Sequence, residues 1–74
     1  MTTKYEALAK DIEALIASGT LAIGDRLPSV RDTVAARGLS PATVFEAYYL
    51  LEARGLVEAR PRAGYFVKAV PAPR

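Results

Sequence analysis

The sequence predicts a mainly α-helical fold that carries a small β-hairpin near its C-terminal end. Apolar residues recur with helical spacing in three segments, each opening at a serine or threonine and closing at a glycine. Two short strand-like runs then flank the turn-forming stretch PRAG, residues 61–64. A chain of 74 residues has room for one domain, which we expect at residues 1–69, with residues 70–74 starting a linker or tail.

The first helix is expected from Lys4 to Ser18. Thr3 and Glu6 have the spacing of a capping box, and Gly19 supplies a left-handed stop. The apolar face of this segment consists of Tyr5, Leu8, Ile12, Leu15 and Ile16. These positions recur every three or four residues, so they predict a helix with one buried side.

A short strand is expected next, within the stretch LAIGDRLPS. Leu21 and Ile23 alternate with a smaller residue, as in a strand, and Gly24 with Asp25 is a turn signal. Pro28 disfavours helix before the next cap. We therefore expect a strand and then a turn between the first two helices.

Two further helices follow with only Gly38 and Leu39 between them. Ser29 caps the second helix, with Asp32 in the position of the capping-box acid. The third is expected from Ser40 to Arg54, because an N-cap serine precedes a proline whose fixed φ is already helical. Its buried stripe is predicted to be Val44, Ala47, Tyr48 and Leu51.

Helices joined by so tight a turn form a helix-turn-helix. With the hairpin after it, the predicted layout is that of a winged helix-turn-helix.

The composition excludes several kinds of site. The chain has no cysteine and no histidine, which rules out disulfides, thiolate zinc sites and histidine-dependent catalysis. No paired-carboxylate site stands out either, so an enzyme is not expected and no cofactor is assigned to this chain. The N-terminal stretch lacks the apolar core of a signal peptide, and no run approaches the length of a membrane span, so a cytoplasmic location without membrane contact is expected.

Charge is distributed unevenly along the chain. The net charge is only +2, but every charged residue after Glu58 is basic. These residues are Arg60, Arg62, Lys68 and Arg74. Such a cluster suits either a polyanion or simple solvation, and the fold has to decide between them.

Three stretches carry a family resemblance: IASGTLAIGDRLPSVRD, LSPATVFEAYYLLEARGLV and RPRAGYFV. Together they resemble the DNA-binding domain of GntR-family bacterial transcription regulators, over residues 5–67. They are most similar to the MocR branch, in which this domain precedes an aminotransferase-like, pyridoxal-phosphate-binding domain. The resemblance implies double-stranded DNA as the partner, and a homodimer only with an effector domain or on a two-fold operator. A pyridoxal-phosphate-binding domain would then be expected beyond this chain.

The resemblance also implies how the domain would meet DNA. Residues 40–54 would form a recognition helix in the major groove, with its first turn against base edges. Arg31 stands near the start of the second helix, where GntR-like domains use an arginine on the DNA. A guanidinium beside a helix N-terminus suits a phosphate, whereas the alternative for Arg31 is a solvated helix face.

The sequence departs from the family at Pro41 and Phe45, where many relatives carry arginine and another basic residue. Proline has no side-chain donor and cannot make a bidentate contact to guanine. The first turn then offers Ser40, Ala42 and Thr43, whose methyls suit thymine and whose hydroxyls suit phosphates or bases. For Thr43, a local bond to its own backbone is the alternative.

The hairpin is expected to supply the other contacts. Arg60 and Arg62 flank a proline at its tip and suit a narrow minor groove, while Gly64 would allow close approach to a sugar-phosphate edge. Arg26 or Lys68 would add one more phosphate contact. Solvated hairpin arginines are the alternative.

A second hypothesis is a winged-helix module that binds a protein through the aromatics of the third helix. Phe45 and Tyr49 are four residues apart on a face that the buried stripe does not use. We expect the hairpin to cover them in part, with docking of a partner as the alternative. Salt would separate the two hypotheses, since DNA binding weakens steeply with salt and an apolar interface does not.

Overall fold

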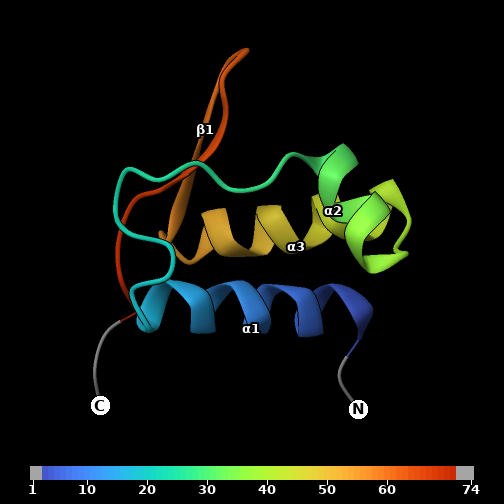
Figure 1. The fold of residues 1–74 in the computed structure, drawn as a ribbon, viewed down its shortest axis with the longest axis horizontal. Coiled ribbons are helices and arrows are strands. Elements are labelled where there is room, and N and C mark those ends of the chain that lie inside the picture. Colours follow the sequence, from blue (N-terminus) through green and yellow to red (C-terminus); the bar gives the residue numbers. More distant parts are fainter. Residues whose placement is uncertain (1–2, 72–74) are drawn as a thin grey trace.

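The computed structural model describes residues 3–71 and shows three helices followed by a two-stranded antiparallel hairpin (Figure 1). The elements are α1 (Lys4–Ala17), α2 (Val30–Arg37), α3 (Pro41–Ala53), β1 (Val57–Arg60) and β2 (Gly64–Val67). This order confirms the expected winged helix-turn-helix. The expected tail at residues 70–74 lies largely outside the described residues.

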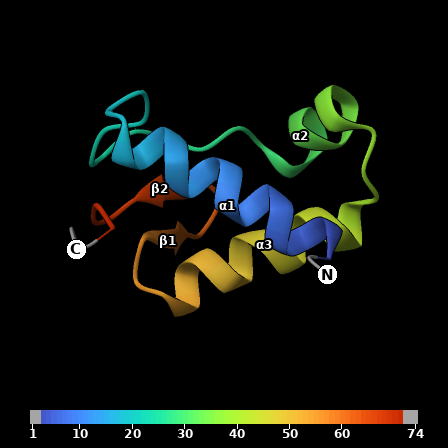
Figure 2. The ribbon, with the colours of Figure 1, turned by 90° about the horizontal axis from the view of Figure 1, so that it is seen from below.

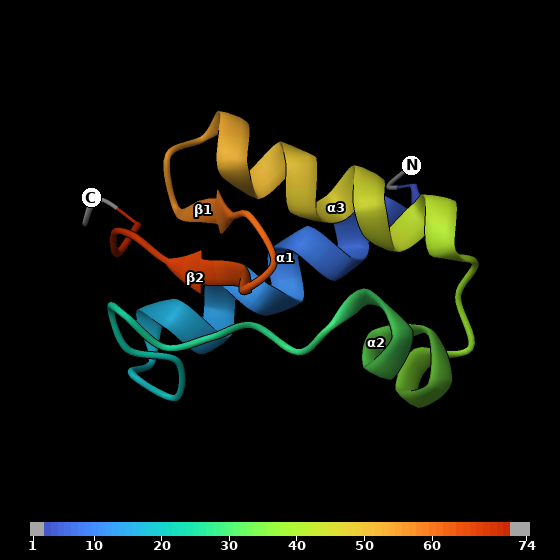
Figure 3. The same cartoon turned by 90° about the horizontal axis from the view of Figure 1, so that it is seen from above.

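The three helices pack together, and the hairpin projects from them. Figure 1 shows α3 packed on α1, with the hairpin rising on the side opposite to α1. Seen from below, α1 lies across α3 (Figure 2). Seen from above, α2 lies beside the N-terminal end of α3 and β1 beside its C-terminal half (Figure 3). The helix-turn-helix and the wing thus share the α3 helix as their common support.

The helix starts follow the predicted caps. At α1 both halves of the capping box form, because the Glu6 N–H donates to Thr3 Oγ1 and the Thr3 N–H donates to Glu6 Oε1. These bonds favour the ionised carboxylate and lower the pKa of Glu6. At α2 the Asp32 N–H donates to Ser29 Oγ at 3.0 Å. The described residues show no return bond from the Asp32 side chain, which is one methylene shorter than glutamate.

The strand expected at Leu21 and Ile23 is wrong. The Ala22 N–H donates to Asp25 Oδ2, and the Asp25 N–H donates back to the Ala22 carbonyl, both at 2.9 Å. With Gly24 at a φ of +92°, residues 22–25 close a turn instead of extending.

Extended pairing starts just after this turn. The Gly24 N–H donates to the Val67 carbonyl, and the Leu27 N–H donates to the Tyr65 carbonyl at 2.8 Å. A single bridge joins Arg26 to Phe66. The loop therefore runs along the free edge of β2 as a rudimentary third strand, three to four residues later than the sequence predicted.

The core is continuous from α1 through α3 to the hairpin. The predicted stripe of α3 is confirmed, since all four of its residues are buried. The remaining buried apolar residues are Leu8, Ala9, Ile12 and Ile16 of α1, with Leu27, Leu56, Val57 and Val67. The other two expected α1 residues, Tyr5 and Leu15, are only half-buried.

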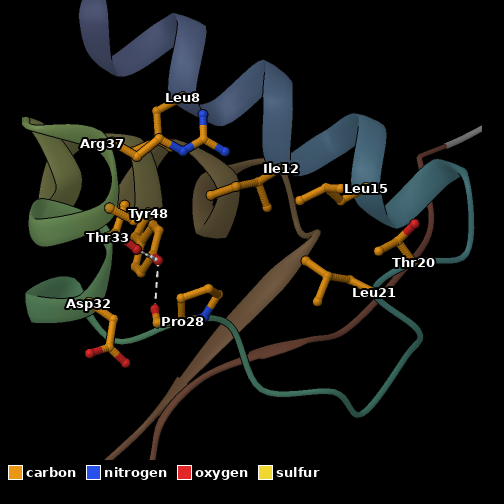
Figure 4. Close-up of a pocket in the computed structure, with 11 residues that line it drawn as sticks. Leu8, Ile12, Leu15, Thr20, Leu21, Pro28, Asp32, Thr33, Arg37 and Tyr48 are labelled. Atoms are coloured by element: carbon orange, nitrogen blue, oxygen red, sulfur yellow. Dashed lines mark hydrogen bonds between the residues drawn. The ribbon is translucent and has the colours of Figure 1, made fainter.

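The buried hydroxyl of Tyr48 joins three parts of the fold. It donates to the Pro28 carbonyl at 2.6 Å, and Thr33 Oγ1 lies 2.9 Å away (Figure 4). A phenol has one hydrogen, so the Thr33 hydroxyl donates to it in turn. The ring also meets Tyr65 edge-on, with centroids 5.1 Å apart. Sequence periodicity did not reveal Thr33, the one buried polar residue among those described.

A pocket of about 300 Å³ lies between α1, α2 and the loop before α2 (Figure 4). Its walls are mostly apolar and include Leu8, Ile12, Leu21 and Pro28, with Tyr48 on one side. Within residues 3–71, no cluster of acidic residues could hold a metal ion, and no helix has the length and apolarity to cross a membrane.

The Tyr48 bonds predict a specific loss of stability. Tyr48→Phe removes the partner of the part-buried Pro28 carbonyl and of the buried Thr33 hydroxyl, which should lower the free energy of unfolding by about 1–3 kcal/mol. Urea unfolding followed by circular dichroism measures this change. Tyr49→Phe, which removes an exposed hydroxyl from the same helix, is the control and should change little. Equal effects of the two substitutions would contradict the assigned role.

The same residue predicts a pH dependence. Burial raises the pKa of Tyr48 above its ordinary value of 10.0, so the folded state favours the neutral phenol. Its contribution to stability is present below pH 10 and is lost as the pH rises through the folded pKa. The stability difference between the wild type and Tyr48→Phe should therefore shrink above pH 10. Tyr65 titrates in both proteins, so the comparison isolates Tyr48.

Candidate nucleic-acid interface

The first turn of α3 is exposed and capped. Ser40, Pro41 and Ala42 are exposed, whereas Thr43 is half-buried. The Thr43 N–H donates to Ser40 Oγ at 3.3 Å, and the two hydroxyls lie 2.9 Å apart. The Thr43 hydroxyl therefore has a local partner. That partner is the Ser40 hydroxyl and not the Thr43 backbone, which was the expected alternative to a DNA contact. Ala42 is exposed, and its methyl group makes no hydrogen bond.

Arg31 is exposed in the first turn of α2, as the second residue after the Ser29 cap. Figure 3 shows that this helix lies beside the N-terminal end of α3. Within residues 3–71, Arg31 forms no ion pair. The predicted guanidinium at a helix N-terminus is thus available to an external anion.

Arg60 does not project freely from the hairpin tip. Its Nη2 and Nε lie 2.8 and 3.1 Å from Glu58 Oε1, and its guanidinium carbon lies 4.4 Å from the centre of the Phe66 ring. Residues two apart on a strand share a face, so Glu58 and Arg60 meet along β1. The expected outward tip arginine is therefore held on the face of the wing.

Arg62 occupies the tip instead. It is exposed and adopts a φ of +65°, the single left-handed residue other than glycine in the described chain. Such a backbone is uncommon for a non-glycine residue and marks a tightly constrained turn. Arg62 is the wing cation whose side chain the described ion pairs leave unbound.

Gly64 is approached by a side chain of this same protein. A Cβ at Gly64 would lie 3.0 Å from Arg26 Nε, and the glycine has a φ of +114°. The Arg26 guanidinium therefore lies over the glycine where a sugar-phosphate edge was expected, and the approach of DNA to Gly64 stays a prediction. Gly64 also pairs with Arg60 across the hairpin, so both arginines lie on one face of the wing.

Other cations are neutralised away from this surface. Arg37 Nη1 lies 2.6 Å from Asp11 Oδ2 and ties α2 to α1. Arg54 pairs with Glu13 and ties the end of α3 to α1. The exposed cations near α3 and the wing are consequently Arg26, Arg31, Arg62 and Lys68.

Phe45 and Tyr49 form a stacked pair on the outward face of α3. Their ring centroids lie 5.9 Å apart with an interplanar angle of 26°, and the residues are 39% and 53% exposed. The expected cover by the hairpin is thus incomplete.

Residues 4–67 match the family model described as bacterial regulatory proteins of the gntR family. The chain belongs to this family. An uncharacterized HTH-type transcriptional regulator from Escherichia coli, YdcR, is 53% identical over 86% of the chain. A second, YcxD from Bacillus subtilis, is 39% identical over the same share. The chain spans 14% of the length of each of these relatives.

Solved structures share the fold of this chain. YtrA from Sulfolobus acidocaldarius, a GntR-family transcription factor, superposes with a TM-score of 0.83 and 38% identity over 88% of this chain and 68% of its own. The DNA-binding domain of AraR, solved in complex with operator ORR3, superposes with a TM-score of 0.87. It is 25% identical in sequence, and the match covers 90% of this chain and 81% of the AraR chain. The winged-helix fold of this family is therefore established for the chain.

The cap of α3 predicts a stability change at the centre of this surface. Ser40→Ala removes the acceptor of the Thr43 N–H and the partner of its hydroxyl, which should cost about 1 kcal/mol of unfolding free energy. Ser40→Asp keeps an N-cap acceptor and should retain most of the stability. Thermal unfolding of both variants measures the difference. A Ser40→Ala protein as stable as the wild type would show that Pro41 alone sets the helix start.

Proposed function

We propose that this domain binds operator DNA for a bacterial transcription regulator, with α3 in the major groove and the wing at the minor groove. The observation that carries the proposal is the superposition on the AraR domain, whose structure was solved on its operator. Action on DNA in the cytoplasm, and not catalysis, follows from the same assignment.

The exposed cations support this orientation. Arg31 stands at the start of α2, Arg62 at the wing tip, and Arg26 on the loop that pairs with β2. Cations on three elements around one helix provide phosphate contacts that fix the orientation of a protein on a duplex. Arg62 suits the negative potential of a narrow minor groove.

Base readout by the first turn of α3 should be sparse. Two of its polar groups, the hydroxyls of Ser40 and Thr43, already bond each other. The Ala42 methyl and the remaining lone pairs of these hydroxyls can still face bases. Phosphate contacts should therefore supply most of the affinity, and one isolated domain should bind weakly.

The MocR branch and its pyridoxal-phosphate-binding effector domain are part of this proposal. Their support is that the chain spans only 14% of YdcR and YcxD, so most of each relative lies outside the matched part. Dimerisation through such a domain, or on a two-fold operator, would place two copies of α3 in successive grooves.

The competing function is a winged-helix module that binds protein. The exposed Phe45–Tyr49 stack favours it, because aromatic pairs are common anchors of protein interfaces. Fold alone does not choose between the two functions.

Salt dependence provides the first test. If the four exposed cations without a described ion pair, Arg26, Arg31, Arg62 and Lys68, each neutralise a phosphate, log K against log salt should have a slope of roughly −3 to −4 per domain. Arg31→Ala should reduce this slope by about 0.9, since one phosphate contact is lost. Arg37→Ala is the control, because Arg37 is paired with Asp11. Fluorescence anisotropy with a duplex measures both, and affinity that ignores salt would reject DNA binding.

The Glu58–Arg60 pair provides a second test. Glu58→Gln removes a carboxylate from the wing and releases Arg60, so DNA binding should tighten by several-fold at low salt. The salt slope should steepen by up to about 0.9 if Arg60 gains a phosphate. Asp11→Asn is the matched control, since it makes the same change in net charge and also breaks an arginine pair, but on α1. Equal tightening by both variants would assign the gain to net charge and not to the wing.

A further inference from the structure

We infer that Phe45, held in place by Tyr49, reads the 5-methyl groups of thymine in the major groove. The inference rests on the proposed function and deepens it, since it names the base chemistry that α3 recognises. It would explain why Phe45 and Tyr49 are exposed, because they would determine which DNA sequence the domain prefers.

The outward face of α3 is an apolar stripe. Pro41, Phe45 and Tyr49 follow each other at intervals of four residues and therefore share one side of the helix. All three are exposed, with Ala42 beside them in the first turn. The opposite side carries the buried residues that pack on α1 and the hairpin. The stripe thus lies along the face that the core leaves open.

The chemistry of this stripe selects one kind of base contact. Residues 41–53 contain no lysine or arginine, so α3 cannot offer the bidentate contact to guanine O6 and N7. An aromatic ring and a methyl instead suit the thymine C5-methyl, the apolar group that a base pair displays in the major groove. The structure therefore favours thymine at the positions that Phe45 and Ala42 reach.

The stack orients Phe45 before any partner arrives. Its ring lies parallel to within 26° of the Tyr49 ring, at 5.9 Å between centroids. A side chain that is already ordered loses less rotamer freedom on binding, which makes a small methyl contact more effective.

Charge complementarity favours DNA over a second copy of the chain. Exposed arginines stand at the start of α2 and at the wing tip, Arg31 and Arg62. A duplex presents phosphates to these arginines while its groove receives the apolar stripe. A second copy placed on the same face by a two-fold axis would bring like charges together.

The test removes single methyl groups from DNA. Sites are first selected from a random duplex pool with the 74-residue chain, and each thymine of the selected site is then replaced by uracil, which lacks only the 5-methyl. At the thymine that Phe45 contacts, uracil should weaken wild-type binding by about fourfold, the value of one buried methyl. Phe45→Ala should bind the thymine and uracil duplexes equally. Anisotropy titration at fixed salt gives each ratio.

Two further variants distinguish a reading contact from a structural role. Phe45→Leu keeps an apolar group and should retain part of the preference for thymine over uracil. Tyr49→Phe keeps the stack and should retain all of it, whereas Tyr49→Ala should reduce it because Phe45 loses its support. Thermal unfolding confirms that each variant is folded before its ratio is interpreted.

The outcomes separate this inference from the proposed function. Salt-dependent binding with equal affinity for thymine and uracil at every position would overturn the methyl readout while leaving DNA binding intact. A thymine preference that persists in Phe45→Ala would also overturn it. No salt-dependent binding to any duplex would overturn both. Sedimentation that shows a dimer abolished by Phe45→Ala, without any thymine preference, would assign the pair to contacts between copies.

Discussion

The helix-turn-helix depends on the buried hydroxyl of Tyr48. It donates to the Pro28 carbonyl, which directly precedes the Ser29 cap, and it accepts from Thr33 on α2. The orientation of α2 against α3 is therefore specified by polar geometry, whereas apolar packing alone tolerates sliding. The Tyr48 ring also contacts Tyr65 of β2, so the same residue helps to position the wing. Arg31 and the first turn of α3 keep a fixed separation because this one side chain joins their supports.

One of the arginines of the wing, Arg60, is neutralised by an ion pair with Glu58. Glu58 holds Arg60 over the Phe66 ring, and Arg26 lies over Gly64 on the same face. Arg60 thus has less reach but a defined position, since a bound guanidinium has fewer rotamers to lose. Arg62 differs because its left-handed backbone sets its direction while its side chain stays exposed. The exposed tip residue Arg62 can then contact DNA first, whereas Arg60 becomes available only when its bond to Glu58 breaks.

Local signals were enough to predict the helices, and long-range contacts explain what the sequence did not reveal. The caps at Thr3, Ser29 and Ser40 act within three residues, so their spacing alone located the helix starts. The strand expected at Leu21 failed because the Asp25 side chain closes a turn, and this bond outweighs alternation over so short a run.

In the candidate site, too, the features that depend on neighbouring residues were predictable and those that depend on distant residues were not. The exposure of the α3 first turn followed from helical periodicity, and the Glu58–Arg60 pair could have been found from their two-residue spacing. The contact of Arg26 with Gly64 joins residues 38 positions apart, and no local pattern encodes it.

The structure separates affinity from specificity onto different elements. Among residues 41–53 there is no cation, while the exposed arginines lie on the loop, the start of α2 and the wing. Phosphate attraction then acts from outside α3, falls steeply with salt and is blind to sequence. Contacts from the apolar stripe of α3 are weak individually but nearly independent of salt. Raising the salt should therefore lower total affinity while increasing the share of binding energy that discriminates between sequences. Pairing two such domains adds the base contacts of a second α3 together with a second set of phosphate contacts, so the gain in selectivity is largest where salt has weakened the phosphate contacts.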